Sequence, residues 1–84
     1  MIEFHTLSAP ERRMLLEMLA SERAGEVSLH VAHYGRSRVA DSLEELAMAE
    51  WVGDKEIVFT ELGRWLAEAL AERLVRRDGW QLAC

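Results

Sequence analysis

The chain has 84 residues, half of them hydrophobic, and a formal net charge of −5. This length predicts one domain and leaves no room for a separate catalytic domain, and the hydrophobic share argues against intrinsic disorder. Nucleic-acid binders are expected to have a basic surface, because phosphate neutralisation supplies most of their non-specific affinity, so the net charge opposes that class. The one cysteine, Cys84, excludes an internal disulfide.

No apolar run approaches the roughly 20 residues that span a bilayer, and the first residues lack the pattern of a signal peptide. We therefore expect a cytoplasmic protein that does not enter membranes. The sequence shows neither a nucleophile with an adjacent base nor a glycine-rich phosphate loop, so an enzyme and a bound cofactor are not expected. We interpret residues 1–84 as a single domain with a core of about 8–77 and a short tail over 78–84.

The first predicted helix begins after Ser8. Ser8 and Glu11 have the spacing of a capping box, and Pro10 is tolerated because amides in the first helical turn have no helical partner. Apolar residues at helical spacing over 14–19 predict its buried face. Gly25 is expected to end the helix in a left-handed conformation.

The middle of the chain predicts two helices joined by a tight turn. Ser28 is a candidate cap for a short helix over 29–33, a turn containing glycine follows at 34–35, and a longer amphipathic helix occupies about 36–50. Two helices joined in this way form the helix-turn-helix pattern, in which the second helix reads DNA with its N-terminal residues. His30 and His33 would share a face of the short helix. No second ligand cluster completes that spacing, so no metal site is predicted.

A hairpin and a last helix complete the predicted domain. Short strands at 51–52 and 57–59 flank a tight turn, and Thr60 is expected to cap the helix that follows. Gly63 lies in the first turn of that helix, where glycine costs roughly 1 kcal/mol relative to alanine, so we expect it to allow close packing against the hairpin. Trp51 and Trp65 are expected to fill the core between hairpin and helix.

This order of elements resembles a winged helix-turn-helix domain, and its details are similar to small bacterial and phage transcription regulators of the MarR-like and PadR-like kinds. The stretch VADSLEELAMAEWV (39–52) is similar to a recognition helix with its exit into the first wing strand. The stretch IVFTELGRWLAEAL (57–70) is similar to the second wing strand and the start of the last helix. The resemblance covers residues 8 to about 75 and implies a mostly α fold with a small β-hairpin.

The resemblance also implies a function. In that family the start of the recognition helix enters the major groove and the wing tip reaches the neighbouring minor groove. A DNA-binding transcriptional regulator is therefore expected, with double-stranded DNA as its partner and a homodimer formed through the last helix and tail. The expected DNA-contacting residues are Arg36, Ser37, Arg38, Ser42 and Lys55.

Acidic residues on the same elements support an alternative. Asp41, Glu44 and Glu45 follow the arginines on the expected recognition helix, and the wing tip GDKE holds two acids and one lysine. DNA phosphates repel acids that are not paired with a cation or a base amine. The alternative is a winged-helix protein-interaction module, either an adaptor or a phage-type inhibitor such as an anti-host-defence protein, that binds a basic host protein. Trp80 in the tail is a candidate anchor for that partner or for a second copy.

Overall fold

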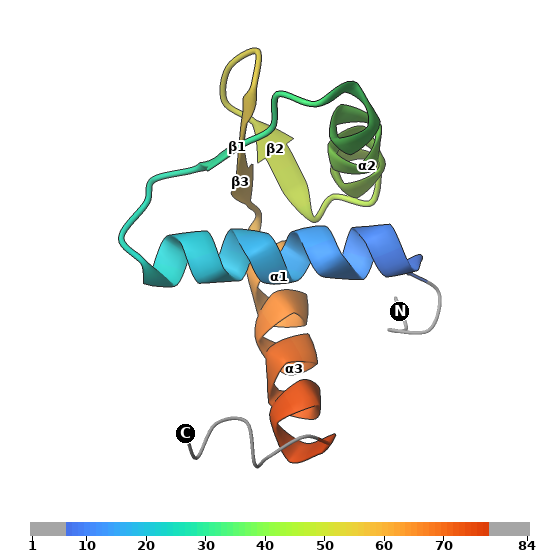
Figure 1. The fold of residues 1–84 in the computed structure, drawn as a ribbon, viewed down its shortest axis with the longest axis vertical. Helices are drawn as coiled ribbons and strands as arrows, with labels where there is room; N and C mark the ends of the chain where they lie inside the picture. The colour runs from blue at the N-terminus through green and yellow to red at the C-terminus, as the bar shows by residue number, and fades with distance from the viewer. Residues whose placement is uncertain (1–6, 78–84) are drawn as a thin grey trace.

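The computed structural model describes residues 7–77, with side chains for residues 7–73, and shows a mostly helical fold with a small antiparallel sheet (Figure 1). The prediction of this fold class is confirmed. The strand order in the sheet is β1-β3-β2. The elements in chain order are α1 (Ala9–Arg23), β1 (Leu29–His30), α2 (Tyr34–Glu45), β2 (Ala49–Trp51), β3 (Glu56–Phe59) and α3 (Glu61–Arg77).

Helix α1 is the central element. The sheet and α2 lie on one side of it, and α3 crosses it on the other side (Figure 1). The predicted capping box is present: the Ser8 hydroxyl accepts from the Glu11 amide at 3.2 Å, and the Glu11 carboxylate accepts from the Ser8 amide at 2.8 Å. Gly25 follows the helix with φ +91°, as expected of a left-handed cap. The buried side chains of α1 are Met14, Leu15, Met18 and Leu19.

The predicted hairpin is confirmed, although β2 begins at Ala49, two residues before the expected start. In the register of β2 and β3, Ala49 lies opposite Phe59 and Trp51 lies opposite Ile57. Ile57 also lies opposite Leu29 of β1, so β3 is the central strand. The largest fully buried side chains come from all three helices, the sheet and the segments between them: Leu15, Leu43, Met48, Ile57, Leu66 and Val31.

Helix α3 begins in close contact with the segment that connects α2 to the hairpin. A Cβ atom on Gly63 would lie 1.8 Å from the carbonyl oxygen of Met48, so only glycine fits. The Thr60 hydroxyl accepts from the Gly63 amide at 3.1 Å and donates to the Ala47 carbonyl at 2.6 Å. The predictions of close packing at Gly63 and of a cap at Thr60 are both confirmed.

The predicted short helix over 29–33 is wrong. Leu29 and His30 form β1, and the Val31 amide donates to the Lys55 carbonyl at 2.7 Å. Leu29 is half-buried, His30 is exposed and Val31 is buried, which is the two-residue alternation of a strand. Because the backbone groups here pair with the hairpin, this segment has no need of helical hydrogen bonds.

Helix α2 therefore differs from the expected recognition helix at both ends. It begins at Tyr34, in the expected turn, because the His33 side chain caps it by accepting from the Gly35 amide at 3.2 Å. It ends at Glu45, short of residue 50, and Ala47 takes a left-handed φ of 62° before β2 begins. Among the described residues, α2 is the one helix between β1 and β2, so the expected helix pair is absent there. His30 and His33 share no helix face.

The prediction for Trp65 is also wrong, because its side chain is 58% exposed. The side of α3 that faces the core carries Gly63, Leu66, Ala67 and Leu70, and the small residues allow α3 to approach the rest of the domain closely. Trp65 precedes Leu66 by about 100° around the helix and so lies outside that face. Trp51 is half-buried against the core, in partial agreement with the expectation.

Candidate nucleic-acid interface

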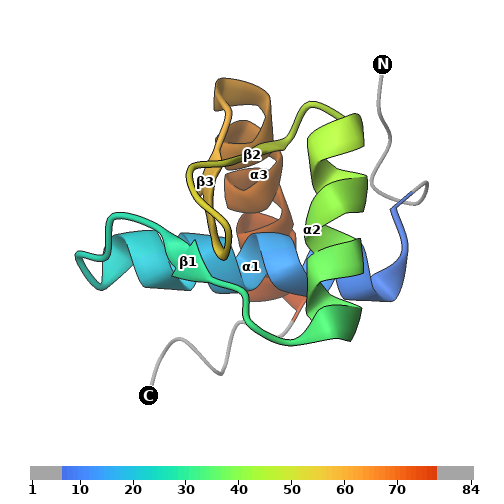
Figure 2. The ribbon, with the colours of Figure 1, turned by 90° about the horizontal axis from the view of Figure 1, so that it is seen from above.

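Helix α2 and the β2–β3 loop lie on the same side of the molecule, away from the C-terminal end of α3. Figure 1 shows the start of α2 and the loop at the upper end of the domain, and Figure 2 shows both of them from above. The predicted DNA-contacting residues come from these two elements. The sheet carries the loop, and contacts with α1 and β2 hold α2 in place.

The charges on α2 are ordered along its length. Its first turn has no acid and its last turn has no base. Arg36 and Arg38 lie in its first half. Three carboxylates lie in its second half: Asp41, Glu44 and Glu45. The helix macrodipole is positive at the N-terminus and negative at the C-terminus, so these charges add to the polarity of the helix instead of offsetting it.

Arg38 and Tyr34 are the outward-facing residues at the start of α2. The Tyr34 side chain is 76% exposed and Arg38 is also exposed. They are four residues apart and therefore share one helix face. Tyr34 was missed as a site residue because the pair Tyr34-Gly35 was interpreted as a turn. The signal that identifies it is His33, whose side chain caps the helix one residue earlier.

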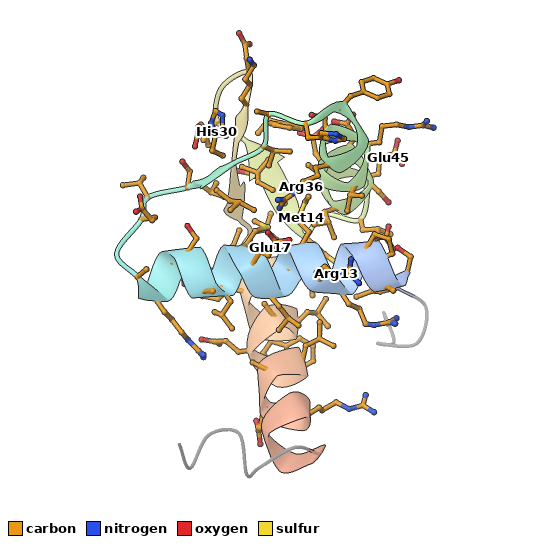
Figure 3. All side chains as sticks on the ribbon, viewed as in Figure 1. Arg13, Met14, Glu17, His30, Arg36 and Glu45 are labelled. Carbon is orange, nitrogen blue, oxygen red and sulfur yellow. The ribbon has the colours of Figure 1, made fainter. Side chains whose placement is uncertain are left out.

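Arg36 points back toward α1. Its Nη2 atom lies 2.7 Å from Oε1 of Glu17, and Figure 3 shows the two side chains directed toward one another. The Arg36 side chain is 41% exposed and the Glu17 side chain is 40% exposed. Exposed ion pairs of this kind contribute about 0–1 kcal/mol, so a phosphate can compete with Glu17 for Arg36 at low cost.

The two serines have partners within the domain. The Ser37 hydroxyl donates to the His33 carbonyl at 3.2 Å, inside the first turn of α2. The Ser42 hydroxyl donates to the Glu11 carboxylate, so it lies at the contact between α1 and α2. That hydrogen bond, assisted by those from Ser8, lowers the pKa of Glu11. Ser42 is thus placed as a link between helices, and Ser37 as part of the helix start.

The loop contributes one exposed cation, Lys55, whose backbone carbonyl is held by the Val31 amide. Asp54 beside it is exposed as well. On α2, Asp41 accepts from the indole nitrogen of Trp51 at 2.8 Å, while Glu44 and Glu45 are exposed and Glu45 projects outward in Figure 3. The structure therefore brings Arg38 and Lys55 to one side of the molecule together with several carboxylates. Trp80 lies outside the described residues.

Two further polar clusters are present, one beside the hairpin and one between α1 and α3. Ser28 and His30 both contact the Glu56 carboxylate, at 2.6 and 2.5 Å, and the Ser28 hydrogen bond, followed by that of His30, lowers the pKa of Glu56. Arg64 binds the Glu22 carboxylate at 2.8 Å, which lowers the pKa of Glu22 and raises that of Arg64. The side chains in each cluster therefore hydrogen-bond to one another within the domain.

Neither a metal nor a membrane helix is indicated in the part of the chain that the structure describes. Within residues 7–77 no three His, Cys, Asp or Glu side chains gather as ligands. No helix there is long and apolar enough to cross a bilayer. A groove of about 310 Å³ lies between the end of α1 and β3, and the charged groups at its edge include the paired Glu22 and Arg64.

Comparison of the chain with protein-family models, curated proteins and solved structures gave no match.

Proposed function

We propose that this protein is a DNA-binding regulator that contacts the double helix with the N-terminal end of α2 and with the β2–β3 loop. The observation that carries the proposal is the charge order of α2, with both arginines near the positive end of the helix dipole and its acids at the negative end. Such an order costs helix stability. It concentrates positive potential at one exposed point of an otherwise acidic protein.

That point suits a phosphate group. The dipole and the first-turn amides of a helix N-terminus favour an anion, although the His33 side chain already occupies one of these amides, that of Gly35. Arg38 is exposed beside them, and Arg36 is within the same turn in an ion pair that exchanges easily. Lys55 on the loop supplies a second, separate contact to the backbone of the duplex. Local charge thus offsets the unfavourable net charge of the whole chain.

Base contacts would come from the exposed face of the first turns. Arg38 has the planar fork that binds guanine through two hydrogen bonds, a contact worth about 1–3 kcal/mol of discrimination. Tyr34, one turn earlier on the same face, offers a hydroxyl group and a ring edge. Ser42 is not needed for this contact, because it links α2 to Glu11.

The test is fluorescence anisotropy of the purified protein with duplex fragments from upstream of its own gene, at low and near-physiological salt and with competitor DNA. We expect saturable binding that weakens as salt rises, because each phosphate contact releases counterions. Arg38→Ala should weaken specific binding about 5- to 150-fold, the equivalent of about 1–3 kcal/mol. Arg13→Ala is the matched control, since Arg13 is an exposed arginine on α1 (Figure 3). Equal affinity of both variants and wild type would remove Arg38 from the mechanism.

A second candidate is an acidic protein-interaction module that binds a basic host protein. The observation that favours it is the exposure of Glu44 and Glu45, together with the engagement of Arg36 by Glu17. The double variant Glu44→Lys, Glu45→Lys separates the candidates. It should strengthen DNA binding under the first proposal, because carboxylates near phosphates are removed, and should abolish capture of a basic partner under the second.

A further inference from the structure

The groove between the end of α1 and β3 lies where the central strand loses a neighbour. In the antiparallel pairing of β1 with β3, Leu29 lies opposite Ile57. Two positions further along the same register, Val27 would lie opposite Phe59. That pair is not formed: the two residues share no backbone hydrogen bond, and Val27 is 91% exposed. Strand β3 therefore extends past the end of β1.

The end of α1 holds residues 26–28 away from β3. The Ser21 hydroxyl donates to the Ser28 carbonyl at 3.4 Å, and the Glu26 amide donates to the Ser21 carbonyl at 3.0 Å. Gly25, with its left-handed φ of +91°, turns the chain just before this segment. Because residues 26–28 are bound to α1, they do not continue β1 along β3.

The backbone of Phe59 is directed into this gap. The Val52 amide donates to the Glu56 carbonyl at 2.9 Å, and the Thr60 amide donates to a carbonyl before β2 at 3.2 Å. Alternate residues of β3 thus bond to β2, and Phe59 lies at a position between them, so its N–H and C=O point away from β2. Neither group hydrogen-bonds to a residue that the structure describes. Unpaired main-chain groups at a strand edge are a template for a further strand.

The groove beside these main-chain groups is largely apolar. Its apolar lining includes side chains from α1, β1 and β3: Met18, Leu29, Ile57, Val58 and Phe59. Its volume of about 310 Å³ is at the lower end of the roughly 300–1,000 Å³ that is typical of small-molecule pockets. The groove therefore has room for a short stretch of chain with one apolar side chain directed inward.

The charges at the groove identify the chemistry of its occupant. The charged residues that line it are Glu22, Glu26 and Arg64. Arg64 binds the Glu22 carboxylate at 2.8 Å, and its Cζ atom lies over the Phe59 ring, 5.8 Å from the centroid. The exposed Glu26 side chain has no ion pair or hydrogen bond within the described part of the chain. One negative charge is thus left unbalanced, and it is complementary to a basic residue.

We propose that this groove binds an extended peptide segment of another protein, in which an apolar residue alternates with lysine or arginine. The main chain of the segment exchanges hydrogen bonds with the N–H and C=O of Phe59, in place of the pair that Val27 does not form. Residues directly opposite each other in an antiparallel pair project to the same face. The apolar side chain opposite Phe59 therefore enters the groove, and a neighbouring basic side chain pairs with Glu26.

The peptide site is separate from the proposed DNA contact. The groove lies at the C-terminal end of α1. Helix α2 contacts the other end of α1, where Ser42 donates to Glu11, and Figure 2 shows α2 on that side. Peptide and duplex can therefore bind at the same time. This inference does not depend on DNA binding, which anisotropy measures separately.

The experiment is an NMR titration of the isotope-labelled full chain with the peptide Lys-Val-Lys-Val-Lys, capped at both ends. We expect a dissociation constant on the order of 100 µM to 1 mM, because few main-chain bonds are formed and each contributes little net free energy. The Phe59 amide proton should shift downfield as it gains an acceptor. Smaller shifts should appear over residues 26–29, and Tyr34–Arg38 should not respond.

Two matched changes separate the main-chain contact from the charge contact. N-methylation of both valines removes the backbone donors that would face Phe59 in either register, and it should raise the dissociation constant at least fivefold. Glu26→Gln should raise it about two- to fivefold, as expected for one exposed ion pair. Glu44→Gln is the control for net charge, since Glu44 is an exposed acid on α2, and it should leave the dissociation constant unchanged.

Four results would overturn the proposal: a Phe59 amide that does not shift at millimolar peptide, equal binding of the N-methylated peptide, a Glu26→Gln variant that binds like wild type, or shifts centred on Glu44 and Glu45. The last result would assign basic peptides to α2. A Phe59 amide that is slow to exchange in the free protein, or that shifts with protein concentration, would place the tail or a second copy in the groove and would equally overturn it.

Discussion

Helices α1 and α2 pack against each other on the same core, yet their charges are arranged in opposite ways. Helix α1 has Glu11 in its first turn and Arg23 in its last turn, which is the order that the helix dipole favours. Helix α2 has arginines near its start and carboxylates near its end, with no acid in the first turn and no base in the last. Helix α1, whose first turn has an acid and whose last turn has a base, is the one that contacts α2, α3 and β1.

The difference indicates which helix is constrained by something other than folding. Natural sequences satisfy local rules where only stability matters, and break them at sites where function requires it. Each unfavourable charge near a helix end costs about 0.3–1 kcal/mol at an exposed position. Helix α2 has no offsetting charge at either end, whereas α1 has Glu11 beside Arg12 at its start and Arg23 beside Glu22 at its end. This contrast is the reason for placing the binding site on α2.

Helices α1 and α2 contribute to one hydrophobic core, and a substitution at Gly63 should disrupt the packing of that core. Gly63→Ala should lower the free energy of unfolding by about 3 kcal/mol or more, because the new Cβ would overlap the Met48 carbonyl and the hairpin would have to move. Urea denaturation measures this. Gly53→Ala is the control: nothing lies within 4 Å of its Cβ, and a change beyond about 0.5 kcal/mol there would question the loop geometry.

The contact between α1 and α2 predicts a pH dependence. The hydrogen bond from Ser42, with those from Ser8, lowers the pKa of Glu11. A carboxyl whose pKa is lower in the folded state stabilises the fold above its unfolded pKa, and that stability is lost as pH falls through the folded value. Unfolding free energy should therefore decline below about pH 4.5, with Glu22 and Glu56 contributing in the same direction.

Glu11→Gln should flatten that acid decline, since its side chain does not titrate, and should cost about 1 kcal/mol at neutral pH through a weaker cap and a weaker bond to Ser42. Urea midpoints at pH 7 and on the acid side measure both effects. If the unfolding free energy of the variant fell with decreasing pH as steeply as that of wild type, the hydrogen bond between Glu11 and Ser42 of α2 would not contribute to acid stability.

The smallest expected effect comes from changing one charge at the C-terminal end of each helix, which compares the charge order of α1 and α2 directly. Glu45→Lys places a base in the last turn of α2 and should raise the unfolding free energy by about 0.3–1 kcal/mol, while Arg23→Glu at the end of α1 should lower it by a similar amount. Thermal and urea unfolding at low salt measure the pair. If both substitutions changed stability in the same direction, the charge order of α2 would carry no functional information.

The sequence predicted the parts of the fold that depend on local chemistry. The Ser8 capping box, the Thr60 cap and the left-handed Gly25 follow from residue types at fixed spacings. The role of Gly63 also followed, because a glycine in a helix needs a packing reason. These features need no knowledge of distant partners.

The errors occurred where a distant partner decides the conformation. Residues 29–33 suit either a helix or a strand, and pairing with β3, which lies well beyond α2 in the chain, selects the strand. Trp65 fits an apolar helix face in the sequence, yet small residues on the neighbouring face pack closer to the core. Within the candidate site, Ser42 was expected to contact DNA. The sequence does not reveal its hydrogen bond to Glu11, because the two residues lie 31 positions apart and on different helices.

The central claim, that DNA binds the N-terminal end of α2, is tested most directly by NMR titration of the isotope-labelled protein with a short duplex. We predict amide shifts over Tyr34–Arg38 and in the 53–55 loop, weaker at higher salt, with Glu44 and Glu45 shifting little. Shifts centred on Glu44 and Glu45, or no shifts at low salt, would contradict the account and would direct attention to a basic protein partner.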